Sequence, residues 1–119
     1  MPSFWSLFGS EAESATCRWL ESSGFRIVDR NWMRPWGELD IVAVKAGVVH
    51  FVEVKASKVR REGFEPFVRA NRSKMVKVAR TARSWLIANN YGPETEWQLD
   101  LVSVIMNPEG PEFELFDNV

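Results

Sequence analysis

Two strand-forming segments that are separated by only two residues place the strongest constraint on the fold of this chain. Segments 38–45 and 48–56 are rich in Ile and Val, and the Ala46-Gly47 pair between them has the length of a tight hairpin loop. A two-residue loop sets Lys45 opposite Val48 and thereby fixes every later pair of the two strands. The sequence therefore predicts an antiparallel hairpin of defined register.

That register brings four charged side chains together. It sets Asp40 opposite Glu53. It also sets Glu38 opposite Lys55, and the two-residue period of a strand keeps all four on one face. Directly opposed residues have Cβ atoms about 5 Å apart, so two carboxylates repel unless one is protonated or a cation lies between them. An exposed charge ladder explains Glu38 with Lys55, but not two acids between runs of Ile, Val and Phe.

A divalent cation would resolve the repulsion between the two acids. Oxygen ligands from Asp40 and Glu53 favour Mg²⁺ or Mn²⁺, which polarise phosphoryl oxygens and lower the pKa of a bound water. Lys55 would then orient that water or neutralise the charge that develops on the phosphate. The residues alone leave two interpretations open, a metal site that acts on phosphodiesters and a cross-strand charge ladder.

The cysteine and histidine counts exclude other chemistries. Cys17 is the single cysteine and His50 the single histidine, so neither an internal disulfide nor a zinc site of Cys and His can form. A Ser-His-Asp triad would need His50 as its base. That residue lies in a strand-like segment and alternates with Phe51, so it is expected to point away from Asp40.

The remaining segments predict an α/β domain. Ser10 and Glu13 have the form of a capping box before a helix at 11–23, which Gly24 ends. Apolar spacing and chain breakers then predict, in order, a strand at 25–31, a turn at 31–37, the hairpin, a loop at 57–66, a long helix that ends at Tyr91-Gly92-Pro93, and strands at 97–106 and 113–116. The order α-β-β-β-α-β-β predicts a mixed sheet of about five strands with the helices packed against it. We expect one domain at 10–119 after an aromatic segment at 1–9.

The net charge of −1 conceals a strongly basic segment. Residues 55–83 carry ten Lys and Arg but two acids, a net charge of +8, and the rest of the chain carries −9. Candidate phosphate contacts in and after the loop are Lys58, Arg60, Arg61, Arg72 and Lys74. The alternative is a solvated helix face. Trp32 and Trp36 flank the acid pair, where stacking on unpaired bases competes with ordinary packing.

Nothing in the sequence predicts a membrane protein. No apolar stretch reaches the roughly 18 residues of a membrane span, and the N-terminus lacks the features of a signal peptide. We therefore expect a cytoplasmic protein without membrane attachment. Aromatic residues at 4–8 leave contact with a membrane surface or a partner as the alternative to packing on the domain.

Two motifs carry a resemblance to a known family. Gly37-Glu38-Leu39-Asp40-Ile41-Val42 and Phe51-Val52-Glu53-Val54-Lys55 resemble the signature of the YraN family of largely uncharacterised bacterial proteins. That family is assigned to the PD-(D/E)xK nuclease superfamily and is similar in fold to archaeal Holliday-junction resolvases. Further matches run nearly end to end, at Trp19-Leu20, Gly24, Arg30-Asn31, 72–74, 81–83 and Leu99-Asp100.

The resemblance implies a restriction-endonuclease-like fold and metal-dependent cleavage of DNA, at branched or single-stranded structures. It implies that Asp40, Glu53 and the Val54 carbonyl hold Mg²⁺ or Mn²⁺, and that Lys55 is the catalytic lysine. Glu13 would complete the site, with nearby Glu11 as its alternative. Glu38 would orient Lys55 or a water. Resolvase-like relatives work as dimers, so the resemblance also implies a homodimer.

The chain departs from the family pattern outside the acids and the lysine. Gln98 stands where the family usually has arginine, and Ala56-Ser57 where it has Thr-Arg. The alternative function is a nucleic-acid-binding or scaffolding module that keeps the nuclease fold without turnover. A third is a protein-interaction domain that uses the aromatic N-terminus.

Overall fold

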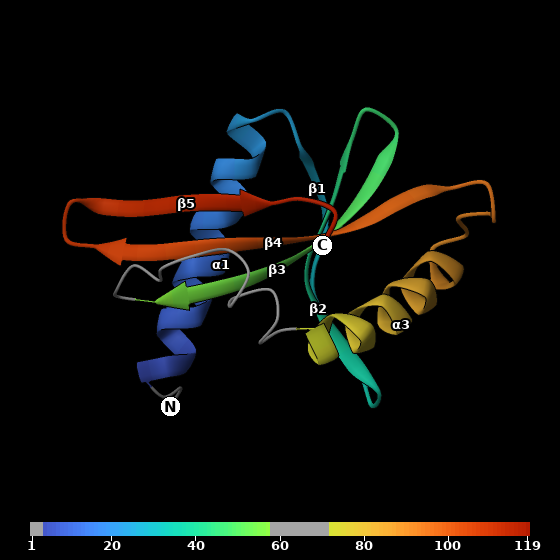
Figure 1. Cartoon of the computed structure of the whole chain (residues 1–119), viewed down its shortest axis with the longest axis horizontal. Coiled ribbons are helices and arrows are strands. Elements are labelled where there is room, and N and C mark those ends of the chain that lie inside the picture. Colours follow the sequence, from blue (N-terminus) through green and yellow to red (C-terminus); the bar gives the residue numbers. More distant parts are fainter. Residues whose placement is uncertain (1–3, 58–71) are drawn as a thin grey trace.

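The computed structural model describes residues 4–57 and 72–119. In chain order its elements are α1 (Phe4–Ser22), β1 (Arg26–Arg34), β2 (Gly37–Lys45), β3 (Val48–Ser57), α3 (Arg72–Ala88), β4 (Glu96–Asn107) and β5 (Gly110–Phe116) (Figure 1). The described part of the chain thus has the predicted order α-β-β-β-α-β-β, and its fold class is α/β as expected.

Five strands form one mixed sheet in the order β1-β2-β3-β4-β5. Neighbouring strands are antiparallel except β3 and β4, which run parallel because the chain between them crosses back along the sheet through α3. The edge strand β5 begins at Gly110 rather than at residue 113. Pro111 fits there because an edge strand leaves one side of its backbone without a partner strand.

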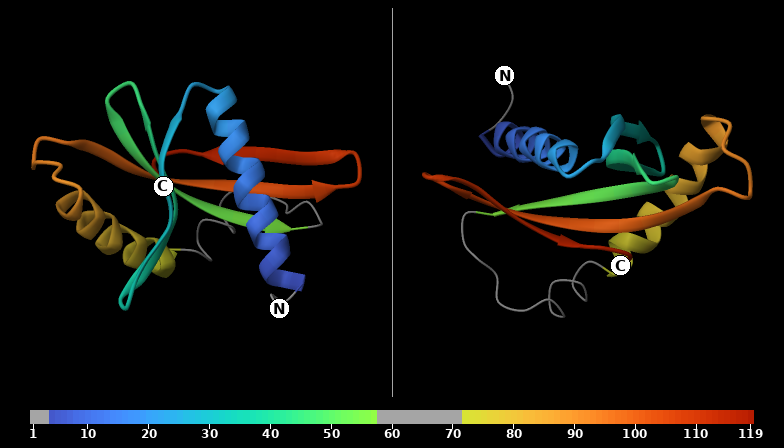
Figure 2. Two further views of the ribbon diagram at one scale, coloured as in Figure 1. Left: turned by 180° about the vertical axis from the view of Figure 1, so that it is seen from behind. Right: turned by 90° about the horizontal axis from the view of Figure 1, so that it is seen from above.

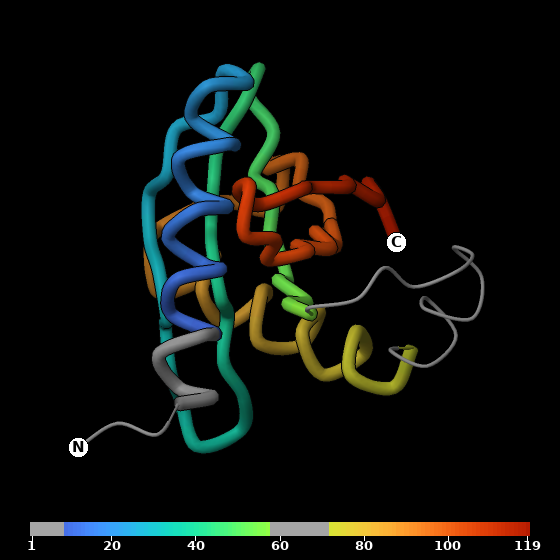
Figure 3. Tube along the Cα trace, turned by 90° about the vertical axis from the view of Figure 1, so that its left-hand side faces the viewer, coloured from blue at the N-terminus to red at the C-terminus, as the bar shows by residue number. Residues whose placement is uncertain are grey.

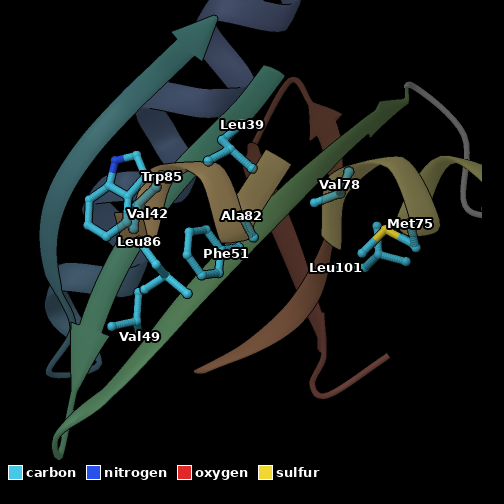
Figure 4. Close-up of a cluster of buried hydrophobic side chains, with 10 residues drawn as sticks. All are labelled: Leu39, Val42, Val49, Phe51, Met75, Val78, Ala82, Trp85, Leu86 and Leu101. Atoms are coloured by element: carbon cyan, nitrogen blue, oxygen red, sulfur yellow. The ribbon is translucent and has the colours of Figure 1, made fainter. Parts of the chain in front are cut away.

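The two helices lie on opposite faces of the sheet (Figure 2). Alternation along β3 supplies both cores, since Phe51 faces α3 while Val52 faces α1, and each is only 1% exposed. The core beneath α3 (Figure 4) comprises Leu39, Val42, Val49, Phe51, Met75, Val78, Ala82, Trp85, Leu86 and Leu101. The core beneath α1 comprises Ala12, Cys17, Leu20, Phe25, Ile41, Ala43, Val52, Val102 and Val104.

The β2–β3 hairpin has the predicted register. Lys45 pairs with Val48 and Ile41 pairs with Val52, across a loop of Ala46 and Gly47. Both loop residues have positive φ, 51° and 79°. Those angles are what a type I′ turn requires, and this turn matches the right-handed twist of the two strands.

Beyond Ile41 and Val52 the two strands of this hairpin separate, and we call the space between them the fork. The last pair between β2 and β3 is Ile41 with Val52. From there β3 continues beside β4 to its end at Ser57, whereas β2 stays paired with β1 back to Gly37. Figures 1 and 3 show β2 and β3 running apart toward the β1–β2 turn.

Two further predicted boundaries are wrong. Helix α1 begins at Phe4 rather than at residue 11, so Ser10 lies inside the helix and does not cap it. The segment predicted as a turn at 31–37 belongs to a second hairpin, in which β1 extends to Arg34 and only Pro35-Trp36 form the turn. Pairing with β2 supplies the backbone hydrogen bonds of this segment, and local Asn, Pro and Gly signals cannot predict such long-range partners.

In the described ranges, 4–57 and 72–119, neither helix has the length and apolar character needed to cross a membrane.

Gly37 should tolerate no larger residue, because the first residue of β2 touches α3. A Cβ atom at Gly37 would overlap the hydroxyl of Thr81. That hydroxyl is buried and donates to the carbonyl of Lys77 at 3.0 Å, so it cannot easily move. We expect Gly37→Ala to lower the free energy of unfolding by about 1–3 kcal/mol, measured by urea denaturation.

The matched control is Gly9→Ala. A Cβ at Gly9 meets no atom within 4 Å, and the residue lies within α1. Alanine there should raise the free energy of unfolding by roughly 0.5–1 kcal/mol because glycine is the poorer helix former. Equal stability of the two alanine variants would show that the β1–β2 hairpin does not rest on α3 as described.

Candidate active site

The fork holds the two acids that the sequence paired. Asp40 lies on β2 and Glu53 on β3, one residue beyond the last backbone pair of their strands. Here a side chain takes the place of the backbone hydrogen bonds between the strands. Asp40 Oδ2 accepts a hydrogen bond from the backbone N–H of Val54 at 2.9 Å. The N–H and C=O of one strand residue point to the same edge, so the Val54 carbonyl also faces the fork.

Glu53 is buried to an unusual degree for a carboxylate, with 2% of its surface exposed. Its Oε2 lies 3.0 Å from the ammonium nitrogen of Lys74, in the first turns of α3. Lys74, whose side chain is 55% exposed, is the one partner that the described part of the chain gives to Oε2. This buried carboxylate oxygen therefore depends on a single, largely exposed cation.

The two carboxylates oppose each other's ionisation. Burial and then the charge of Asp40 raise the pKa of Glu53 to about 7, although Lys74 acts in the other direction. Burial likewise raises the pKa of Asp40, opposed by the N–H of Val54 and the charge of Lys74. Burial alone would lower the pKa of Lys74, but Glu53 and Asp40 raise it. The acid pair thus favours a nearby cation, and Lys74 supplies one.

Glu13 approaches the same acids from α1. Its side chain is half-buried, and burial followed by the charge of Asp40 raises its pKa, while a hydrogen bond with Asn31 acts against the rise. Glu11 is exposed on the same helix, so the structure favours Glu13 over its alternative. Because α1 starts well before Ser10, a capping role no longer accounts for Glu13.

Lys55 and Glu38 do not form the predicted cross-strand pair. The ladder between β2 and β3 ends before reaching them, so the fork separates the two positions. Lys55 is half-buried on the same face of β3 as Glu53, and no described residue forms an ion pair with it. Glu38 is exposed, and its charge contributes to raising the pKa values of Asp40 and Glu13.

The donor set at the fork fits a divalent cation. Among the described residues no three His, Cys, Asp or Glu side chains converge, so a site here would combine the carboxylates of Asp40 and Glu53 with the carbonyl of Val54. Oε2 of Glu53 would gain a bond to the metal. Lys74 does not block this exchange, because its side chain is 55% exposed and can swing into solvent.

The predicted phosphate contacts are described in part. Lys58, Arg60 and Arg61 lie outside the described residues. Arg72 and Lys74 begin α3, and the cations along its exposed surface are Arg72, Lys74, Lys77, Arg80 and Arg83. The ion pair between Lys74 and Glu53 was missed from the sequence, because no spacing rule joins a strand residue to a helix that begins well beyond the end of that strand.

His50 belongs to a second polar cluster, on the face of the sheet that packs against α1. Its Nδ1 lies 2.7 Å from Oδ2 of the fully buried Asp100. The other carboxylate oxygen of Asp100 accepts from Gln98 at 2.8 Å and from the backbone N–H of Asn118 at 2.9 Å. His50 thus points away from Asp40 as predicted, and Gln98, a departure from the family pattern, helps to satisfy a buried charge.

Comparisons with known proteins give the family. Residues 12–104 match the model of the uncharacterised protein family UPF0102. UPF0102 proteins of Helicobacter pylori (strain P12) and Campylobacter concisus (strain 13826) are 36% and 35% identical to this chain, over 93% and 95% of its length and 89% and 93% of theirs. One of Campylobacter fetus subsp. fetus (strain 82-40) is 32% identical over 85% of this chain and 86% of its own. UPF0102 is the YraN family, so the predicted resemblance is confirmed.

The raised pKa of Glu53 predicts how stability depends on pH in EDTA. The folded state binds this proton with a pKa of about 7, against an ordinary value of 4.5. Between these values the folded chain holds more protons than the unfolded chain, so the free energy of unfolding falls as pH rises. The contribution of Glu53 to this fall is up to about 3 kcal/mol.

Glu53→Gln should remove the contribution of Glu53 to the fall in the free energy of unfolding with rising pH, since glutamine does not titrate. Guanidinium unfolding of both proteins at about pH 5 and about pH 8, in EDTA, measures the difference, in which titrating groups that do not interact with Glu53 cancel. If the wild type and the variant lose the same stability over that interval, Glu53 does not carry the buried proton.

Proposed function

Since the chain belongs to the uncharacterised family UPF0102, whose description names no activity, we propose a function from the fork itself: metal-dependent hydrolysis of phosphodiester bonds in DNA. One observation carries the proposal. Two acids from adjacent strands, the half-buried Asp40 and the buried Glu53, lie side by side, and the partner of Glu53 Oε2 among the described residues is the exposed ammonium of Lys74. Structural proteins have little reason to keep such a pair, because burying like charges costs stability.

Each residue of the fork has a role in this reaction. A divalent cation held by Asp40, Glu53 and the Val54 carbonyl would polarise a phosphoryl oxygen and lower the pKa of a bound water. Lys55, on the same face of β3 as Glu53, donates a hydrogen bond to the attacking water or to the phosphate oxygens. The water oxygen forms the new bond to phosphorus, and the bond to one sugar oxygen breaks, which leaves a phosphate monoester and a hydroxyl.

Residues around the acids complete the site. Glu13 adds negative charge from α1 on the side of Asp40, where it helps to hold a cation or its water. Arg72, Lys74 and the exposed cations that follow on α3 bind the phosphate backbone beside the fork. DNA with branched or unpaired segments is the substrate class that the resemblance to resolvases implies.

The ion pair between Lys74 and Glu53 favours a second candidate. Because Lys74 already neutralises the buried acid in the described structure, the fork is stable without a metal. On that basis the chain would bind nucleic acid through its cations and perform no turnover. Binding would then be sensitive to salt and would persist in EDTA.

Cleavage assays separate the two candidates. We expect the wild type to cut labelled single strands, duplexes or four-way junctions in Mg²⁺ or Mn²⁺. Asp40→Asn and Lys55→Ala should each lower the rate by about 100-fold or more, because they remove a metal ligand and a charge that stabilises the transition state. Glu94→Gln, an exposed acid in the turn after α3, is the matched control and should cut normally. Equal cleavage by all four proteins would reject the assignment.

Lys74 should compete with the cation. Lys74→Gln removes a positive charge that lies 3.0 Å from Glu53. We therefore expect it to tighten Mn²⁺ binding several-fold at about pH 8, where the acids are ionised, and to weaken binding of DNA. Isothermal titration with Mn²⁺ measures the first effect. Lys77→Gln, which removes an exposed cation of the same helix, is the matched control for Mn²⁺ binding. If Lys74→Gln binds Mn²⁺ more weakly than the wild type while Lys77→Gln binds it equally well, a metal site at Glu53 is contradicted.

A further inference from the structure

The tip of the β1–β2 hairpin carries an exposed tryptophan. Trp36 is 51% exposed, whereas Trp85 is 2% exposed. The other tryptophans with described side chains, Trp19, Trp32 and Trp97, are half-buried. Tryptophan is rarely left in solvent without a ligand or partner, since exposing its ring forgoes the large stabilisation that burial gives. No described ring or cation packs on Trp36, so it differs from the rest of the set.

The position of Trp36 is fixed relative to the fork. It stands in the two-residue turn before β2, four positions before Asp40 in the chain. At the rise of an extended strand that spacing is about 13 Å. Pro35 restrains the turn, and Gly37 leaves no gap between the hairpin and Thr81 on α3. The turn that carries the ring is therefore held against α3, about 13 Å along the chain from Asp40.

Arginines accompany the tryptophans of this hairpin. The guanidinium of Arg34 lies 3.8 Å from the ring centre of Trp32, and Arg30 is exposed farther along β1, where it donates to Ser14 on α1 at 3.0 Å. Of the acids, Asp29 accepts from the indole of Trp85, and Glu38 is exposed two positions after Trp36. Aromatic rings interleaved with arginine are the pattern that binds single strands, by stacking on bases and neutralising phosphates.

We propose that Trp36 stacks on an unpaired base of the DNA strand whose phosphodiester lies at Asp40 and Glu53. This inference rests on the proposed function and narrows its substrate. Paired bases within a duplex are stacked on one another and offer no free face, so Trp36 selects a strand with an unpaired segment. With about 13 Å between Trp36 and Asp40 along the chain, the stacked base lies a few nucleotides from the bond that is cut.

Binding without turnover tests the proposal. In EDTA, the wild type should bind a duplex with a short single-stranded overhang about tenfold more tightly than the same duplex with blunt ends, measured by fluorescence anisotropy. Trp36→Ala should lose this preference and keep its affinity for the blunt duplex. Trp36→Phe keeps a stacking ring and should retain most of the preference. The matched control is Ile87→Ala, a residue that is 76% exposed near the far end of α3 and should change neither affinity.

A second experiment locates the base. In Mg²⁺, an abasic position is moved one nucleotide at a time along the unpaired strand, and cleavage by the wild type should fall most at one position, a few nucleotides from the cut. Trp36→Ala should flatten this profile. Equal preference for overhangs in Trp36→Ala and the wild type would overturn the inference. So would a change of oligomeric state by light scattering with unchanged DNA binding, which would make the tip a protein interface.

The failure of each proposal has its own signature. If the wild type prefers overhangs through Trp36 but cuts no substrate in any metal, the proposed hydrolysis fails and the stacking site stands. If cleavage depends on Asp40 and Lys55 while Trp36→Ala has no effect on any substrate, hydrolysis stands and the stacking site is rejected.

Discussion

The burial of two like charges side by side is the interaction on which the rest of this structure depends. Asp40 and Glu53 share the point at which two paired strands separate, and burial raises the pKa of each. A hydrogen bond from the N–H of Val54 holds Asp40, and an ion pair with the ammonium of Lys74 holds Glu53. The pair therefore needs either a proton on one acid or a cation beside it, from the chain or from solution.

The fork can form because β2 and β3 each have a second neighbouring strand in the sheet. β3 remains paired with β4, and β2 remains paired with β1, so each strand keeps one paired edge where the two part. Helices on opposite faces then reach the fork from two directions, with Glu13 on α1 and Lys74 on α3. The β1–β2 hairpin carries Trp36 past the fork, and its contact with Thr81 holds this tip in place.

Much of the fold and part of the site followed from local patterns. The register of the β2–β3 hairpin came from a two-residue loop, and it correctly made neighbours of Asp40 and Glu53. Where prediction was wrong, a distant partner overruled a local signal. A turn predicted at 31–37 is a strand because β2 supplies its hydrogen bonds, and Ser10 caps nothing because α1 begins at Phe4. The predicted cross-strand pair of Glu38 and Lys55 is also wrong, because β2 and β3 separate before these two positions can meet.

The sequence by itself determined which acids meet and in what order the elements follow, because strand period and loop length act over a few residues and need no knowledge of the rest of the chain. Only the tertiary structure decided how those acids are neutralised and what surrounds them. Lys74 and Glu13 reach the fork through packing between elements that are far apart in the chain. The exposure of Trp36 was decided in the same way, because burial depends on which surfaces the helices cover and which they leave in solvent.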